Sequence, residues 1–204
     1  MATTKRASVP GEVDKLIAHQ SRLLKAPRIA GHYARLAEQG RAAGWSLEDY
    51  LAAVLAVESN ARAESGARQR IRYAGFPAIK TITDFDFTAQ PALDRAQIAR
   101  LEGGGWLAEA RNVVLLGPPG TGKTHLATAL AIAAAQAGHR VAFAPATGWI
   151  SRLAEAHSIG RLEAELRKIS RYGLIVIDEV GCAPRGADVS CERRYSPLVI
   201  AVTG

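Results

Sequence analysis

Three glycines, a lysine and two threonines fall within residues 117–124, near the middle of the 204-residue chain. This stretch matches the pattern G-x-x-x-x-G-K-[ST] at every defined position. Glycines remove side-chain bulk and allow backbone angles that turn successive N–H groups toward one point. Such donors, together with an ammonium group and a hydroxyl, suit a dense and strongly hydrated anion. The pattern therefore predicts a phosphate-binding loop.

The flanks of the stretch are those that a phosphate-binding loop requires. The apolar run Val113–Leu116 predicts a buried strand before it, and an alanine-rich apolar segment predicts a helix after it. That helix would add unpaired N–H groups and the positive end of its dipole. A glycine-rich turn with a chance Lys-Thr pair is the alternative, and it would not explain these flanks. The residues expected to bind the nucleotide are Gly117, Pro118, Pro119, Gly120, Thr121, Gly122, Lys123 and Thr124.

Two carboxylates form a second candidate group. The run Leu174–Asp178 predicts a buried parallel strand, and Glu179 follows it. Open α/β sheets bind their ligands at the carboxyl ends of strands. We therefore expect Thr124 and Asp178 to hold Mg²⁺, and Glu179 to orient and deprotonate an attacking water. The catalytic candidates are Lys123, Asp178 and Glu179. The alternative is a strand that simply ends in solvated acids.

Strand and helix patterns alternate through the second half of the chain. Strands are predicted at residues 140–144 and Leu174–Asp178, with helices at residues 150–156 and 161–170 between them. This alternation predicts βαβ units and a parallel sheet, which is an α/β fold.

The first 75 residues have a different character. Residues 1–14 are polar and basic and predict a disordered arm, and residues 15–75 predict a small helical module. Its helices are expected at residues 15–24, 32–40 and from Ser46, as N-cap, to about residue 68. Pro27 and Gly31 are interpreted as breaks between them. The nucleotide domain would then occupy residues 76–204.

Residues 80–87 join the two predicted domains and alternate polar with apolar residues. This alternation places Phe85 and Phe87 at strand spacing. Two roles are open for these rings, packing in the core or forming a wall of the adenine pocket.

The chain carries a net charge of +7 and has a pI of about 9.8. A basic balance favours polyanionic partners, nucleic acid above all. Four arginines lie close together next to two aromatic residues, and they are the candidate DNA contacts: Arg62, Arg68, Arg70 and Arg72. Two interpretations are open, a grip on a phosphate backbone or a solvated helix face before a linker.

The cysteines and the apolar runs indicate the cellular compartment in which the protein is expected. The two cysteines, Cys182 and Cys191, form no metal-ligand pattern, which favours a reduced cytoplasmic protein. The N-terminus lacks the apolar core of a signal peptide. The longest apolar run, residues 126–135, is too short to span a bilayer, so no membrane association is expected.

With these residues in hand, the chain resembles the IstB-like ATP-binding proteins, which are AAA+ helper ATPases of insertion-sequence transposition related to DnaA and DnaC. The resemblance rests on LLGPPGTGKTHLATALAIAAAQAGHRVAF and RLEAELRKISRYGLIVIDEVG, and on LKAPRIAGHYARLAEQ and RIRYAGFPAIKTITDFDF upstream. It implies an AAA+ domain that uses ATP and Mg²⁺. It also implies a homo-oligomer on duplex DNA that recruits or activates a transposase.

The resemblance ends after Gly181. There the family continues with a helix, a strand ending in a polar sensor residue, and an arginine finger, whereas this chain reads CAPRGADVSCERRYSPLVIAVTG. Leu198–Thr203 is expected to form a strand beside the P-loop strand. No sensor or finger is expected, and nothing supports Arg193 or Arg194 in the finger role. We therefore expect an incomplete, C-terminally truncated core.

Two further functions remain alternatives to the transposition helper. One is a nucleotide-binding remnant with negligible turnover, since an arginine finger is worth about 10³–10⁵ in rate. The other is a DnaC-like helicase loader.

Overall fold

The computed structural model describes residues 11–180 and 198–203. The chain divides into two compact units between Ser65 and Gly66. We call residues 11–65 the helical unit, and residues 66–180 with 198–203 the sheet unit. In the described part of the chain, no helix is both long enough and apolar enough to cross a bilayer.

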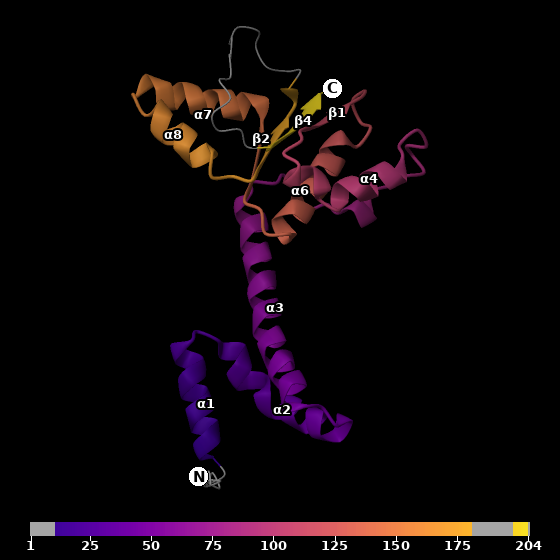
Figure 1. The fold of residues 1–204 in the computed structure, drawn as a ribbon. Helices are drawn as coiled ribbons and strands as arrows, with labels where there is room; N and C mark the ends of the chain where they lie inside the picture. Colours follow the sequence, from indigo (N-terminus) through magenta and orange to yellow (C-terminus); the bar gives the residue numbers. More distant parts are fainter. Residues whose placement is uncertain (1–10, 181–197, 204) are drawn as a thin grey trace. The chain divides into compact units, whose positions relative to one another are not determined.

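The helical unit contains α1 (Glu12–Leu23), α2 (Pro27–Ala43) and the first part of α3 (Leu47–Tyr73), as Figure 1 shows. Ser46 caps the start of α3, because its Oγ accepts the Asp49 N–H while its own N–H donates to the Asp49 carboxylate, both at 3.1 Å. The predicted cap is thus confirmed.

The predicted break at Pro27 and Gly31 is wrong. Pro27 is the first residue of α2 and Gly31 lies inside it. A proline is favoured at the first helical position because the N–H that it lacks would have no partner there. The true break is residues 24–26, where Lys25 has a left-handed backbone with φ of 53°.

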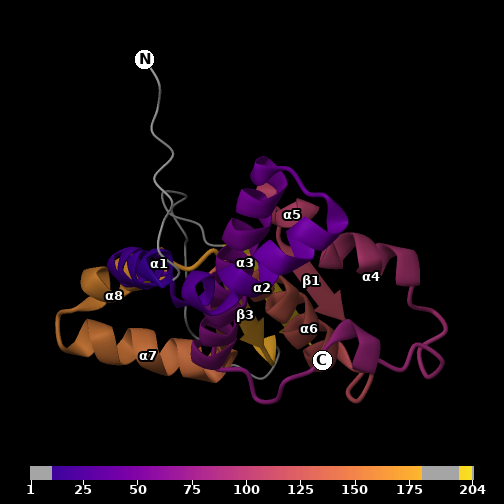
Figure 2. The same ribbon diagram turned by 90° about the horizontal axis from the view of Figure 1, so that it is seen from below.

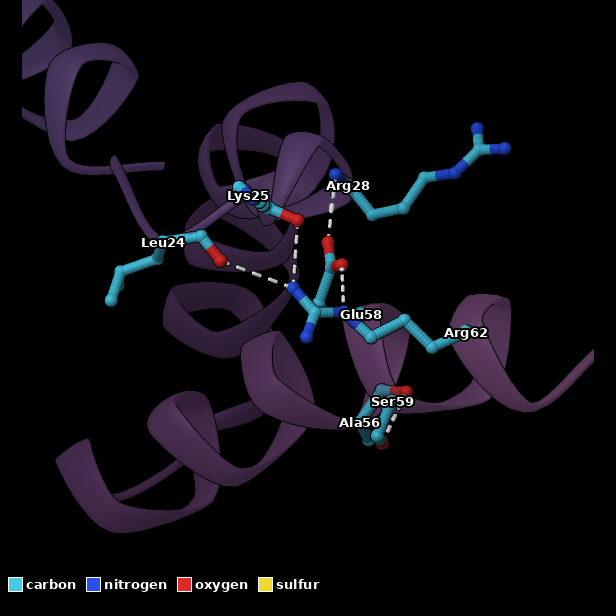
Figure 3. Close-up of polar contacts among 7 residues, drawn as sticks. All are labelled: Leu24, Lys25, Arg28, Ala56, Glu58, Ser59 and Arg62. Carbon is cyan, nitrogen blue, oxygen red and sulfur yellow. Dashed lines mark hydrogen bonds and ion pairs between the residues drawn. The ribbon is translucent and has the colours of Figure 1, made fainter. Parts of the chain in front are cut away.

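A carboxylate near the middle of α3, together with its arginine partner, links α3 to the start of α2 and to the end of α1 (Figure 3). Glu58 is only 8% exposed. One of its oxygens accepts the Arg28 backbone N–H at 3.0 Å and the other accepts Arg62 Nε at 2.7 Å. Arg62 Nη2 also donates to the carbonyls of Leu24 and Lys25, at 3.2 and 2.7 Å. The pair therefore places negative charge at the N-terminus of α2 and positive charge at the C-terminal end of α1, as the helix dipoles favour.

The sheet unit is built on a four-stranded parallel sheet in the order β1-β4-β3-β2. The strands are β1 (Val113–Leu116), β2 (Val141–Pro145), β3 (Leu174–Asp178) and β4 (Leu198–Thr203). The pairing of β4 with β1 confirms the predicted strand beside the P-loop strand, with Val113 opposite Ile200.

Helices cover the sheet on two faces. The helices are α4 (Arg95–Glu102), α5 (Gly105–Ala108), α6 (Lys123–Gln136), α7 (Ala146–Ser158) and α8 (Leu162–Ile169). Helix α6 packs across all four strands, and its alanines meet Val141, Leu174 and Val176. The alternate residues Ala142 and Ile175 face α7 and α8, which lie side by side in Figures 1 and 2.

The last turns of α3 belong to the sheet unit. Arg70 Nε donates to the Ala135 carbonyl at 2.6 Å, and the Phe143 N–H donates to the Ala74 carbonyl at 2.7 Å. Ala74 is 2% exposed and sits in the main core. The division therefore falls ten residues before the boundary expected near residue 75. The reason is that α3 is continuous across the division, and its last turns contact the sheet unit instead of the helical unit.

Residues 80–87 do not form the strand-like segment that their alternation predicted. They contain a 3₁₀ turn, η1 (Ile82–Asp84), closed by reciprocal bonds between Thr81 and Asp84. Thr81 N–H donates to the Asp84 carboxylate at 2.9 Å. Side-chain capping of the backbone here replaces the ladder that a strand would need.

The Glu58 contacts predict how stability depends on pH. Arg62 lowers the pKa of Glu58 below its ordinary value of 4.5, so the unfolded chain takes up a proton first as the pH falls. The stability that this carboxylate contributes is full above pH 4.5 and is lost as the pH falls through the lowered pKa. Glu58→Gln should therefore lower the melting temperature at neutral pH, and the difference from wild type should shrink well below pH 4.5.

Circular dichroism melts would measure this difference, with Glu64→Gln, an exposed carboxylate of the same helix, as the control. A gap between wild type and Glu58→Gln that does not change with pH would contradict the assignment.

Candidate nucleotide-binding site

The predicted phosphate loop connects β1 to α6. Gly120 and Gly122 have φ of 77° and 84°, in the left-handed region that favours glycine. Gly122 is the N-cap of α6 and offers no side-chain acceptor to the first turn of the helix. The first N–H groups of α6 therefore point toward the loop, where an anion can accept from them.

Lys123 folds back over the loop. Its Nζ donates to the carbonyls of Gly117 and Pro118, both at 2.7 Å, and Thr121 Oγ1 donates to Pro118 at 2.9 Å. These bonds keep the ammonium charge at the loop. A phosphate chain would offer it stronger, charged acceptors in place of carbonyls.

Thr124 and Asp178 meet although they are far apart in the sequence. Thr124 Oγ1 donates to Asp178 Oδ1 at 3.2 Å, and Asp178 is 8% exposed. A hydroxyl and a carboxylate are the hard oxygen donors that Mg²⁺ prefers, so the pair fits a magnesium ion. No cluster of three or more His, Cys, Asp or Glu residues occurs among the described residues, so any such ion depends on this pair and its ligand.

Glu179 lies beside this pair at the end of β3. Its N–H donates to Asp178 Oδ1 at 3.0 Å, and its backbone is left-handed with φ of 57°. A left-handed glutamate is uncommon and costs about 1–2 kcal/mol. Glu179 is exposed, although it directly follows the buried carboxylate of Asp178.

Phe85 packs directly under the loop. It is 9% exposed and lies with Ile98 and Leu126 in a small core cluster. A Cβ placed on Gly122 would come within 2.6 Å of the Phe85 ring. Glycine at position 122 is therefore needed for a close approach as well as for its φ. Of the two roles left open for Phe85, the structure supports packing in the core.

His125 holds the preceding segment against the first turn of α6. Its Nε2 donates to the Thr81 carbonyl at 2.9 Å, and its ring meets Phe85 edge-on with centroids 5.2 Å apart. Sequence analysis missed His125, because its partner lies in a segment whose conformation the alternation pattern misassigned.

A cavity of about 530 Å³ lies beside the loop. Lys123, Thr121 and Leu126 line it from the loop and α6, and Gln90 and Gln97 line it from the segment around α4. Amide groups over an apolar floor can pair with the edge of a flat, polar ring. Sequence analysis missed both glutamines, since nothing in their spacing marks them.

Comparison with known proteins decides the family. The family described as IstB-like ATP binding protein matches residues 19–189. The chain belongs to this IstB-like family. An insertion-sequence IS21 ATP-binding protein of Pseudomonas aeruginosa is 37% identical over 186 residues, covering 88% of this chain and 70% of the relative. An insertion-sequence ATP-binding protein of Sinorhizobium fredii is 33% identical over 158 residues, but the match covers only 53% of that relative.

The fold also matches a solved structure. AMPPCP-bound DnaA from Aquifex aeolicus superimposes with a TM-score of 0.52 at 17% identity, over 63% of this chain and 43% of that chain. This likeness confirms the AAA+ fold predicted for the IstB-like chain. Together with the family match, it confirms the resemblance on which the ATP-binding prediction rests.

The four arginines predicted to contact DNA have different surroundings in the IstB-like chain. Arg62 is engaged by Glu58 and two carbonyls, and Arg70 by the Ala135 carbonyl. Arg68 is exposed, and the Arg72 guanidinium lies 5.9 Å from the Tyr73 ring centroid. Among the described residues, no backbone carbonyl accepts a hydrogen bond from the side chain of Arg68 or Arg72.

Strand β4 lies between β1 and β3 and ends at Thr203, which is opposite Leu116 in the register. The expectation that no sensor residue is present stays a prediction. Arg193, Arg194 and both cysteines lie outside the described residues.

The close approach at Gly122 predicts that two alanine substitutions will differ. Gly120→Ala and Gly122→Ala both force alanine into a left-handed backbone, at a cost of about 1–2 kcal/mol each. Position 120 has no atom within 4 Å of a new Cβ, whereas position 122 meets Phe85. Gly122→Ala should lose about 1–3 kcal/mol more, as overpacking does, and should also weaken ATP binding.

Thermal unfolding and calorimetric ATP titration of both variants would measure this difference. Adding Phe85→Leu to Gly122→Ala should recover part of the loss. Equal melting temperatures for the two single variants would show that Phe85 does not constrain the loop.

Proposed function

We propose that this chain binds Mg·ATP, hydrolyses it slowly, and acts in the cytoplasm on DNA as an oligomeric helper of a transposase. The observation that carries the proposal is the convergence of Lys123, Thr124 and Asp178 at the carboxyl edge of a parallel sheet. Support for the context comes from the relatives, whose names place them in insertion sequences.

Each residue of the site has a distinct task in this proposal. Backbone N–H groups of the loop and of the first turn of α6 bind the phosphates. Lys123 exchanges its two carbonyl acceptors for phosphate oxygens. Thr124 and Asp178 would hold Mg²⁺, which supplies positive charge to the phosphate oxygens. Glu179 orients a water and takes its proton on the carboxylate.

A second candidate is nucleotide binding without turnover. The observation in its favour is Glu179, which is exposed and whose carboxylate accepts no hydrogen bond among the contacts of the described residues. A general base without an orienting partner loses much of its positioning advantage. Phosphate release therefore separates the two candidates.

Substitutions at two residues distinguish binding from catalysis. Lys123→Ala removes the charged donor to the phosphates and should weaken ATP binding about 100-fold. Glu179→Gln keeps the shape of the side chain but removes the base, so binding should persist while hydrolysis falls by about 10²–10⁴. Fluorescent-ATP titration and a phosphate-release assay with and without DNA would check both.

Wild type that binds ATP and releases no phosphate even beside DNA would establish the second candidate. A wild-type protein that binds no Mg·ATP would contradict both candidate functions.

The arginines of α3 are proposed to contact phosphates of duplex DNA. If Arg68 and Arg72 each neutralise one phosphate, Arg68→Gln/Arg72→Gln should reduce the slope of log affinity against log salt by about 1.8. Arg62→Gln should instead lower the melting temperature, because its guanidinium is held by Glu58 and the end of α1. Fluorescence anisotropy over a salt series and circular dichroism melts would measure the two effects. An unchanged slope in the double variant would show that Arg68 and Arg72 do not contact DNA phosphates.

The choice of partner needs its own experiment. Pull-down with the transposase of an insertion sequence, beside a replicative helicase, would separate the transposition helper from a helicase loader. Retention of the helicase alone would favour the loader.

A further inference from the structure

A second cavity, of about 380 Å³, lies in the sheet unit away from the phosphate loop. Gln69, Arg70 and Tyr73 line it from the last turns of α3, and Arg140 and Tyr172 line it from the residues that lead into β2 and β3. Because the strands are parallel and the phosphate loop follows the carboxyl end of β1, this cavity lies at the opposite, amino edge of the sheet.

The cavity combines positive charge with aromatic rings. Both charged side chains in its lining are arginines, and it contains no carboxylate. The Arg140 guanidinium lies 5.5 Å from the centroid of the Tyr172 ring. Across the described residues, Arg140 forms no ion pair with an acidic side chain, so its charge is available to an incoming anion.

One wall of the cavity is fixed in place. Arg70 is anchored by the bond from its Nε to the Ala135 carbonyl at the end of α6. Gly66, one turn earlier on α3, leaves room for it, since a Cβ there would lie 3.0 Å from Arg70 Nη1. The guanidinium is thus held against the cavity before any ligand arrives, which lowers the ordering cost of binding.

The remaining wall offers a flat surface. Tyr73 lines the cavity and is 69% exposed, so its ring is open to a ligand from solvent. Aromatic rings beside arginines are the platform on which unpaired bases stack, while the arginines pair with the backbone phosphates. The cavity volume falls within the range of small-molecule sites, about 300–1,000 Å³.

We propose that this cavity binds one unpaired nucleotide of a DNA strand, with its base against Tyr73 and its phosphate on Arg140 and Arg70. The proposal rests on the DNA-binding function proposed above and adds a site to it. An acidic peptide would use the arginines but not the stacking surfaces, so the two tyrosines favour a nucleotide.

The experiment compares two cavity variants with a matched control. Arg140→Gln and Tyr73→Ala should each weaken binding of a fluorescein-labelled single-stranded oligonucleotide about 10-fold, the loss typical of one stacked base or one charged contact. Tyr73→Phe keeps the ring and should bind as wild type does. Arg161→Gln removes the same charge from an exposed site outside the cavity and should change affinity less than about 2-fold.

Unchanged melting temperature and ATP affinity in each variant exclude misfolding as the cause. As a direct readout, an oligonucleotide carrying 5-iodouracil should form a photo-crosslink to the peptide that contains Tyr73. At an oligonucleotide concentration near the wild-type Kd, this cross-link should be several-fold weaker in Arg140→Gln.

Two results would overturn this site while leaving DNA binding intact. In the first, the cavity variants bind DNA no worse than Arg161→Gln; in the second, the cross-link maps elsewhere. Wild type that binds no DNA at all would overturn the site and the proposed function together. If Arg140→Gln loses binding to a polyglutamate probe and keeps DNA binding, the cavity would belong to an acidic protein segment.

Discussion

The site depends on the way α6 packs across the sheet. Parallel strands bring their carboxyl ends to one edge, and α6 begins at that edge because it follows β1 through a loop too short to carry it elsewhere. The bond between Thr124 and Asp178 then joins the first turn of the helix to the end of β3. Loop geometry, the charge of Lys123 and the two acidic residues all take their positions from this single arrangement.

The parts of the site that the sequence predicted are those that rest on local patterns. The phosphate loop needs left-handed backbone angles at Gly120 and Gly122, and the glycines at these positions are visible in the sequence. Strand β3 is recognisable as an unbroken apolar run before Asp178. Each signal needs only a few consecutive residues. For the same reason, Ser46 could be recognised as a cap from Asp49 alone.

Long-range contacts account for what could not be predicted. Pro27 looked like a break because the contact that favours a helix start there is distant in sequence: the Arg28 N–H in the first turn of α2 donates to Glu58 of α3. Phe85 occupied an alternating segment, yet its neighbours are Ile98 and Leu126, far along the chain. Arg62 and Arg70 looked like free surface charges, whereas Arg62 donates to carbonyls directly after α1 and Arg70 donates to a carbonyl of α6. Composition shows that arginines are present but does not show what they contact.

The alanine-rich face of α6 limits which amino-acid substitutions this protein tolerates. Ala127, Ala131 and Ala135 are completely buried, so small side chains let the helix backbone approach the strands closely. A larger residue at any of them would lift the helix and displace the loop at its start. Folding and ligand affinity therefore share the same residues, and thermodynamic linkage makes the coupling mutual, since a bound nucleotide would stabilise the sheet that holds its site. Random mutagenesis should find variants of this helix that lose both properties together and few that lose only one.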